Sequence, residues 1–132
     1  MINLQNKSPR LLVIGDLMID QYLWGSCERI SPEAPVQVIN VDRETKVLGG
    51  AGNVVNNLKK LGAKVDVLSV VGNSETSNEL RSLLSDIEVD TEYLITQENR
   101  TSSKKTRIIA SQQQVVRYDQ ENTDDINKQS QE

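Results

Sequence analysis

The feature that most constrains the fold is a pair of short apolar runs, residues 11–14 and 65–71, each followed directly by a glycine. Runs of this length and composition are typical of buried strands in a parallel sheet. Between them, a segment that opens at Gly49 and Gly50 has helical apolar spacing, and Gly62 is well placed to end that helix. Strand, helix and strand in this order predict a βαβ unit with a right-handed crossover, and therefore an α/β fold with a mainly parallel sheet. The apolar residues of the expected helix are Val54, Val55, Leu58 and Leu61.

Two further groups of elements are expected. A second helix is predicted over residues 75–86, with an apolar face toward the sheet formed by Leu80, Leu83, Leu84 and Ile87. Short strands separated by polar turns predict a small antiparallel sheet that projects from the main layer. These strands are residues 36–41, 46–48, 93–95, 104–110 and 115–118. A small sheet cannot bury both faces by itself, so it must cover something or pair with a partner.

The charge is placed unevenly. Residues 1–118 have as many basic as acidic side chains, and residues 119–132 hold five acids against Lys128, which accounts for the net charge of −4. This distribution predicts no nucleic-acid partner and no attraction to an anionic membrane. Residues 121–132 are polar without an apolar period, which predicts a frayed helix or disorder.

The composition excludes several kinds of catalytic and structural site. The chain has one cysteine, Cys27, so an internal disulfide is excluded and a reducing, cytoplasmic location is the simpler expectation. The longest early apolar run is residues 11–14, too short for a signal sequence or a membrane span. The absence of histidine excludes Ser-His-Asp and Cys-His catalysis, and no metal site is predicted.

The glycine run at residues 49–52, followed by Asn53, is a candidate ligand site. Glycines at a helix start let the backbone approach a ligand closely, and the first N–H groups of the helix are free to donate. The alternative is a flexible connection between strand and helix. No G-x-G-x-x-G follows the first strand, and no G-x-x-x-x-G-K-[ST] is present.

In their context these residues resemble a known family. Residues 49–53, with Gly62 and Gly72 at their spacings, resemble the first signature of the ribokinase (PfkB-type) carbohydrate kinases, and residues 13–20 resemble that family's first strand. Val55 departs from the pattern, which usually has a small residue there. The resemblance implies the N-terminal part of a ribokinase-like fold, with a projecting lid sheet.

The same resemblance assigns the sugar site. It implies that Asp20 accepts hydrogen bonds from sugar hydroxyls and that Gly49, Gly50 and Asn53 contact the substrate. A carboxylate suits this role because it only accepts, whereas hydroxyls donate. The alternative for Asp20 is a solvated loop acid, and Asp16 is open between a turn or capping residue and a ligand contact.

Two longer stretches narrow the substrate. Residues 28–36 (ERISPEAPV) and 101–119 are similar to kinase domains that act on D-glycero-β-D-manno-heptose 7-phosphate. This similarity implies transfer of the ATP γ-phosphate, with Mg²⁺, to the anomeric hydroxyl. The product would be the 1,7-bisphosphate used for ADP-heptose and lipopolysaccharide core.

A phosphate on the sugar calls for cations. Strand periodicity puts Lys105 and Arg107 on one face, and Gln113 and Arg117 on one face of the next strand. If the two faces coincide, they surround a small anionic site, since arginine binds phosphate oxygens bidentately and lysine adds a point charge. The alternative is a solvated strand face.

The resemblance also sets the organisation. Residues 1–120 would be the N-terminal part of a carbohydrate kinase domain, with lid strands at about 21–48 and 91–118, and residues 121–132 an acidic polar tail that continues toward missing parts. The catalytic base and most of the ATP site would lie in those parts, so this chain alone should bind neither ATP nor Mg²⁺ and should be inactive. The lid is expected to form a homodimer through Ile108, Ala110, Val116 and Tyr118.

Three other functions stay open at this point. The chain could belong to another ribokinase-type kinase, acting on fructose 6-phosphate, tagatose 6-phosphate or an unphosphorylated sugar. It could instead be a non-catalytic sugar-binding or assembly fragment. A Rossmann-type nucleotide-binding module is disfavoured because the glycines follow the wrong strand.

Overall fold

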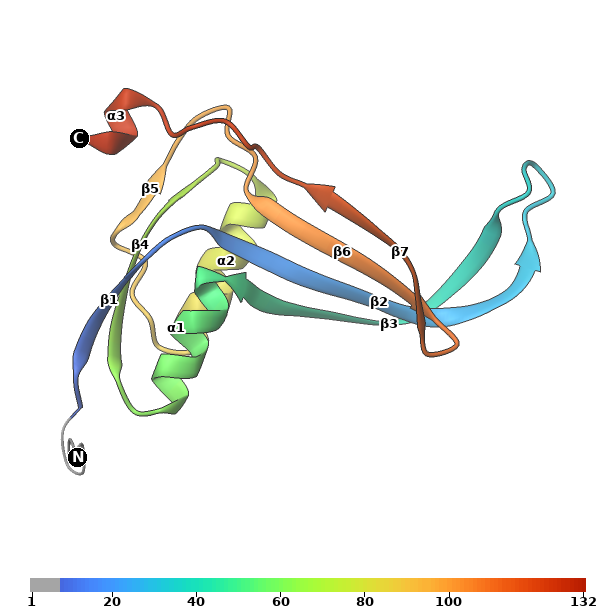
Figure 1. Ribbon diagram of the computed structural model, residues 1–132, viewed down its shortest axis with the longest axis horizontal. Helices are drawn as coiled ribbons and strands as arrows, with labels where there is room; N and C mark the ends of the chain where they lie inside the picture. The colour runs from blue at the N-terminus through green and yellow to red at the C-terminus, as the bar shows by residue number, and fades with distance from the viewer. Residues whose placement is uncertain (1–7) are drawn as a thin grey trace.

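The computed structural model describes residues 8–132, which form a body and a projecting sheet (Figure 1). The body consists of a parallel sheet in the order β1-β4-β5 with helices α1 and α2, and the projecting sheet, here called the lid sheet, has the order β3-β2-β6-β7. The body elements are β1 (Arg10–Ile14), α1 (Ala51–Lys60), β4 (Lys64–Val71), α2 (Glu75–Ser85) and β5 (Leu94–Thr96). The lid strands are β2 (Leu17–Ile30), β3 (Gln37–Gly50), β6 (Ser103–Ala110) and β7 (Gln113–Gln120), and a short α3 (Lys128–Gln131) follows them.

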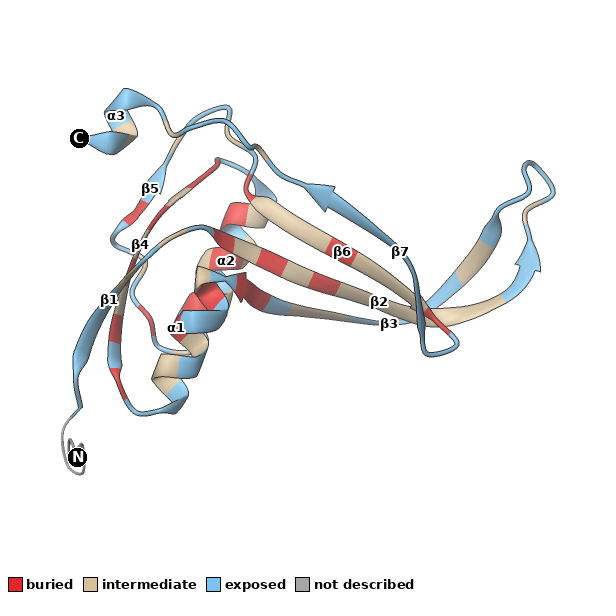
Figure 2. Ribbon diagram, viewed as in Figure 1, coloured by how far each residue is buried: buried red, intermediate tan, exposed pale blue. Residues whose placement is uncertain are grey.

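The predicted βαβ unit is confirmed. β1 pairs with β4 in parallel, and α1 lies between them in the chain, after the long β2–β3 hairpin. Gly50 precedes α1 with a φ of 56°, and Gly62 follows it with a φ of 88°, a region that favours glycine. Both helices pack on one face of the parallel sheet, where Val55, Val67 and Leu80 are fully buried. Figure 2 shows the buried residues gathered where the helices meet the strands.

Burial differs from the prediction at the outer positions of the body. Leu12 and Ile14 of β1 are 56% and 68% exposed, so this strand is not buried on both faces. These side chains lie on the sheet face opposite α1 and α2, where the tail around Ile126 and α3 lies beside Ile14 but leaves it largely exposed. On α1, Val54 and Leu61 are also exposed, because only the Val55 and Leu58 side of the helix meets the core.

The sequence predicted a purely antiparallel projecting sheet, but the sheet is mixed. β2 pairs antiparallel with β3 but parallel with β6, and β6 pairs antiparallel with β7. β2 and β3 are each 14 residues long, since their polar stretches are held by ladders of backbone hydrogen bonds and do not form turns. Residues 93–95 differ as well: β5 pairs with β4, so it lies in the parallel sheet and outside the lid.

The acidic tail is folded onto the body, contrary to the expected fraying. The Arg100 Nη1 atom donates to the Asp124 carbonyl at 3.0 Å, and the Asn127 amide donates to the Gln97 side chain at 3.0 Å. These contacts come from side chains about 25 to 30 residues earlier in the chain, which local periodicity cannot reveal. Within the described part of the chain, no helix has the length and apolar content needed to cross a membrane.

Glu79 of α2 joins the body to the lid. Its carboxylate bridges Lys46 of β3, with Nζ–Oε1 at 2.5 Å, and Lys104 of β6, with Nζ–Oε2 at 3.0 Å. Burial raises the pKa of Glu79, but the hydrogen bonds from Lys46 and Lys104 outweigh it and hold the pKa below the ordinary 4.5. The bridge therefore fixes two lid strands to one helix.

We expect Glu79→Gln to lower the free energy of unfolding by about 1 kcal/mol at neutral pH, because the pair of bridges is partly exposed to solvent. The folded-state pKa of Glu79 is lowered, so its contribution is present above pH 4.5 and is lost as the pH falls through the lowered value. Urea unfolding at neutral and strongly acidic pH measures this difference. Glu98→Gln, an exposed acid without a hydrogen-bond partner in the described structure, serves as the control. A stability loss of equal size at both pH values would contradict the assignment.

Candidate functional site

The predicted sugar-contacting residues converge where the lid joins the body. Asp20 lies on β2, and Gly49 and Gly50 end the adjacent strand β3, whose last residue leads directly into α1. Asn53 lies in the first turn of α1 and is exposed. The start of this helix therefore lies directly after the strand that pairs with the Asp20 strand.

Gly49 and Gly50 are required by close packing and by backbone shape. A Cβ at Gly49 would collide with the Asp20 carboxylate and would lie 2.9 Å from Met18 Cγ. A Cβ at Gly50 would lie 2.6 Å from the Asp16 carbonyl oxygen, which accepts a hydrogen bond from the Ala51 amide. The glycine run is thus more than a flexible connection, since it lets the β3 backbone lie directly against Asp20.

We expect Gly49→Ala to displace the Asp20 carboxylate and to weaken binding of a sugar ligand by about tenfold, the equivalent of one hydrogen bond. Gly62→Ala is the matched control, because Gly62 has a positive φ but nothing lies within 4 Å of the added Cβ. That control should lose about 1 kcal/mol of stability and keep its ligand affinity. Equal affinities for the two variants would remove Gly49 from the site.

Asp20 is held by an ion pair that links β2 to β6. Asp20 Oδ1 lies 2.5 Å from Arg107 Nη1, and the two side chains are 20% and 21% exposed. The hydrogen bond with Asp20 raises the pKa of the Arg107 guanidinium, while burial opposes the rise. The sequence assigned these residues to two different parts of a substrate, and the structure places them in direct contact.

An aromatic ladder supports Arg107. Its guanidinium lies over the Tyr22 ring at 5.2 Å, and Tyr22 stacks on Trp24 with ring centroids 6.0 Å apart. Arg43 covers Trp24 at 4.6 Å. Sequence reasoning missed this feature, although alternate aromatic residues on one strand indicate a shared face.

Lys105 and Arg117 lie on the same face of the lid and are also paired with carboxylates. Lys105 Nζ lies 3.3 Å from Asp119 and 3.1 Å from Glu121, and Arg117 Nε lies 3.0 Å from Asp119. The hydrogen bonds from Glu121 and Asp119 raise the pKa of Lys105. The strand register therefore brings Lys105, Arg107 and Arg117 onto one face, where each cation is paired with a carboxylate.

Gln113 does not join this group. A bulge in β7 changes the pairing from Ile108–Val116 to Ile109–Gln114, so one residue of β7 has no partner. Gln113 consequently pairs with Ala110, on the face opposite Arg107 and Arg117. The simple alternation used for the sequence prediction fails at this extra residue.

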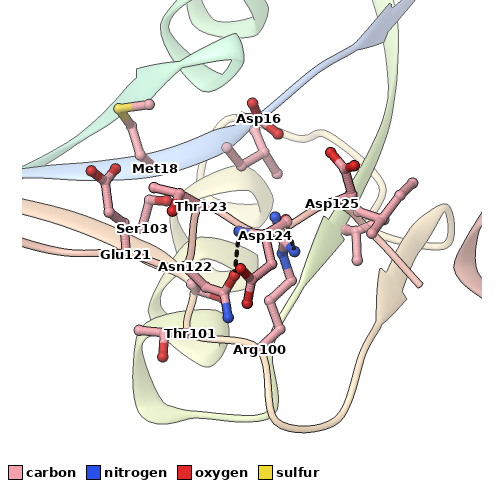
Figure 3. Close-up of a pocket in the computed structure, with 14 residues that line it drawn as sticks. Asp16, Met18, Arg100, Thr101, Ser103, Glu121, Asn122, Thr123, Asp124 and Asp125 are labelled. Carbon is pink, nitrogen blue, oxygen red and sulfur yellow. Dashed lines mark hydrogen bonds between the residues drawn. The ribbon is translucent and has the colours of Figure 1, made fainter.

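A polar cavity of about 520 Å³ lies beside Met18, at the start of β2 (Figure 3). Asp16 and Met18 line one side, and the segment from Glu121 to Asp125 lines the other. Its carboxylates suit ligands with hydroxyl donors, because carboxylates only accept hydrogen bonds. The sequence prediction left this segment outside the site, since nothing in its composition shows that it folds back beside β2.

Metal-ligating side chains are not clustered in the described part of the chain. Across residues 8–132, no three Asp, Glu or Cys side chains converge as metal ligands. The sequence also has no G-x-x-x-x-G-K-[ST].

Comparisons with known proteins agree with this geometry. The family model described as pfkB family carbohydrate kinase matches residues 8–132. A protein named Bifunctional protein HldE from Aliarcobacter butzleri (strain RM4018) is 65% identical over 95% of this chain and 26% of its own length. The protein of the same name from Sulfurimonas denitrificans (strain ATCC 33889 / DSM 1251) is 58% identical over 96% of this chain and 27% of its own length. The chain spans about a quarter of the length of these curated relatives.

The fold has solved counterparts. The structure of Arabidopsis thaliana ribokinase complexed with ribose and ATP aligns with a TM-score of 0.63 and 17% identity, over 88% of this chain and 36% of the ribokinase. At this identity the likeness concerns the fold alone. The predicted α/β architecture is confirmed as part of a ribokinase fold.

Proposed function

Because the chain belongs to the pfkB family of carbohydrate kinases, we propose that it forms the sugar-binding part of a kinase for D-glycero-β-D-manno-heptose 7-phosphate. In that reaction the ATP γ-phosphate is transferred to the anomeric hydroxyl, which gives the 1,7-bisphosphate. The nucleotide supplies the phosphoryl group with Mg²⁺ as its counter-ion. The residues described here bind and orient the sugar.

The observation that carries the proposal is the packing of Asp20 against Gly49. The bare backbone of Gly49 lets the Asp20 carboxylate pack two residues before α1, whose Ala51 N–H donates to Asp16 while the next N–H groups have no partner within the helix. A carboxylate accepts from two neighbouring hydroxyls, and helix N–H groups donate to sugar oxygens. This combination of acceptor and donors suits a polyol and does not suit an apolar ligand.

The phosphorylated substrate is supported by the cations on the lid. Lys105, Arg107 and Arg117 lie on one face, next to Asp20. Their present partners are carboxylates, and a phosphate oxygen can replace a carboxylate oxygen at a guanidinium with the same geometry. The heptose itself is supported by the similarity of residues 28–36 and 101–119 to heptose 7-phosphate kinases.

A ligand panel tests the proposal. We expect heptose 7-phosphate to stabilise the chain against thermal unfolding more than fructose 6-phosphate, tagatose 6-phosphate or ribose at equal concentration, because only a ligand that binds the folded state raises its stability. A preference for another sugar phosphate would support a different ribokinase-type kinase. No shift with any sugar would contradict a sugar-binding role.

The lid also supports a proposed homodimer. Val116 and Tyr118 of β7 are 48% and 46% exposed, and Ile108 lies beside them on β6. Ala110, which the sequence also placed on this surface, is 4% exposed within the single chain and contributes little. Sedimentation at micromolar concentration should give the mass of two chains, and a single-chain mass would contradict the dimer.

A further inference from the structure

We propose that the Asp20–Arg107 ion pair makes the site select phosphorylated sugars through an exchange of partners; this inference rests on the proposed function. Sugar hydroxyls that bond to Asp20 Oδ1 compete with Arg107 for that oxygen. A ligand that also carries an anion gives Arg107 a new partner, whereas an unphosphorylated sugar leaves it without one.

The competition follows from how Asp20 is occupied. Its Oδ1 atom accepts from Arg107 at 2.5 Å, and its carboxylate packs against the backbone at Gly49. Both side chains are about four-fifths buried, so little of the ion pair is in contact with water. A hydroxyl that bonds to Oδ1 therefore shares this oxygen with Arg107 and weakens the ion pair.

Arg107 is held in place by aromatic side chains even when Asp20 binds a sugar hydroxyl. Its guanidinium is held over Tyr22, which is itself stacked on Trp24 beneath Arg43. A partly buried cation that loses its hydrogen-bond acceptor is destabilised, because its desolvation is no longer offset. A sugar phosphate removes this cost, since its phosphate oxygens replace Asp20 at the guanidinium.

The neighbouring cations provide the contrast needed for a test. Lys105 pairs with Asp119 and Glu121 and makes no hydrogen bond with Asp20 in the described structure. Removal of Lys105 therefore weakens a phosphate site without freeing the sugar acceptor. Removal of Arg107 weakens the phosphate site and also frees Asp20 for sugar hydroxyls. The two variants therefore distinguish the exchange of partners at Asp20 from simple attraction of the phosphate by cations.

The test is a calorimetric comparison of heptose 7-phosphate and unphosphorylated heptose, measured on the wild-type chain, Arg107→Met and Lys105→Met. Methionine keeps the aliphatic packing of both side chains. For Arg107→Met we expect about tenfold weaker binding of the phosphate and about two- to fivefold tighter binding of the unphosphorylated sugar, the range set by one partly exposed ion pair. For Lys105→Met only the first change is expected. Arg107→Gln replaces Arg107→Met if circular dichroism shows that the methionine variant is unfolded.

The outcomes separate the two proposals. If Arg107→Met binds unphosphorylated heptose no more tightly than the wild type does, the exchange is wrong although heptose 7-phosphate binding stands. If both variants gain affinity for the unphosphorylated sugar equally, general charge and not the Asp20 pair is responsible, which also overturns the exchange. If the wild-type chain binds neither sugar, the proposed function fails and this inference fails with it.

Discussion

Replacement of Asp20 with asparagine should weaken the binding of heptose 7-phosphate by about 10- to 100-fold. A charge-assisted hydrogen bond contributes about 1.5–3 kcal/mol, and asparagine loses the charge and turns an amide N–H₂ toward a hydroxyl. The loss of the ion pair frees Arg107 for the phosphate, which offsets part of the effect. Titration calorimetry on the variant and the wild-type chain measures the difference.

Asp42→Asn is the matched control for this prediction. Asp42 is an exposed acid on β3 and has no salt-bridge partner within the described structure. It removes the same charge from the same sheet, so general electrostatic attraction predicts equal losses for both variants. A loss confined to Asp20→Asn supports a direct contact with the sugar, whereas unchanged affinity in Asp20→Asn would exclude Asp20 as the acceptor.

The second large effect concerns stability. We expect Leu80→Ala to lower the free energy of unfolding by about 2–5 kcal/mol, because it removes a fully buried side chain from the core between the sheet and the helices α1 and α2 and leaves a cavity. Leu12 and Ile14 on the other face of the parallel sheet are 56% and 68% exposed, so the core beneath the helices supplies most of the apolar burial that stabilises the body. The variant should be largely unfolded at room temperature.

Urea unfolding followed by circular dichroism tests this expectation. Val54→Ala is the control, since Val54 lies on α1 and is 49% exposed. Its stability should stay within about 0.5 kcal/mol of the wild type. A Leu80→Ala chain as stable as this control would show that α2 does not hold the core together.

The parts of the fold that the sequence predicts correctly depend on local patterns. The strands at residues 11–14 and 65–71, both helices and the glycine turn before α1 follow from apolar spacing and from the backbone demands of Gly50 and Gly62. The buried positions Leu80 and Leu84 follow from the same spacing. Each of these features is decided within one turn of helix or a few strand residues.

The parts that the sequence does not predict depend on pairing between distant segments. Asp20 and Arg107 are 87 residues apart, and their contact needs the parallel pairing of β2 with β6. The displacement of Gln113 needs a bulge in β7, which shifts the side-chain alternation by one residue. The location of the acidic tail depends on Gln97 and Arg100, two polar residues that have no local pattern.

This chain is proposed to bind a sugar phosphate at Asp20, beside the start of α1. Titration of the wild-type chain with heptose 7-phosphate, without nucleotide, tests it most directly. We predict saturable heat from one site, lost or strongly weakened in Asp20→Asn and preserved in Asp42→Asn. An absence of saturable binding at millimolar ligand, with the chain folded by circular dichroism, would contradict the claim.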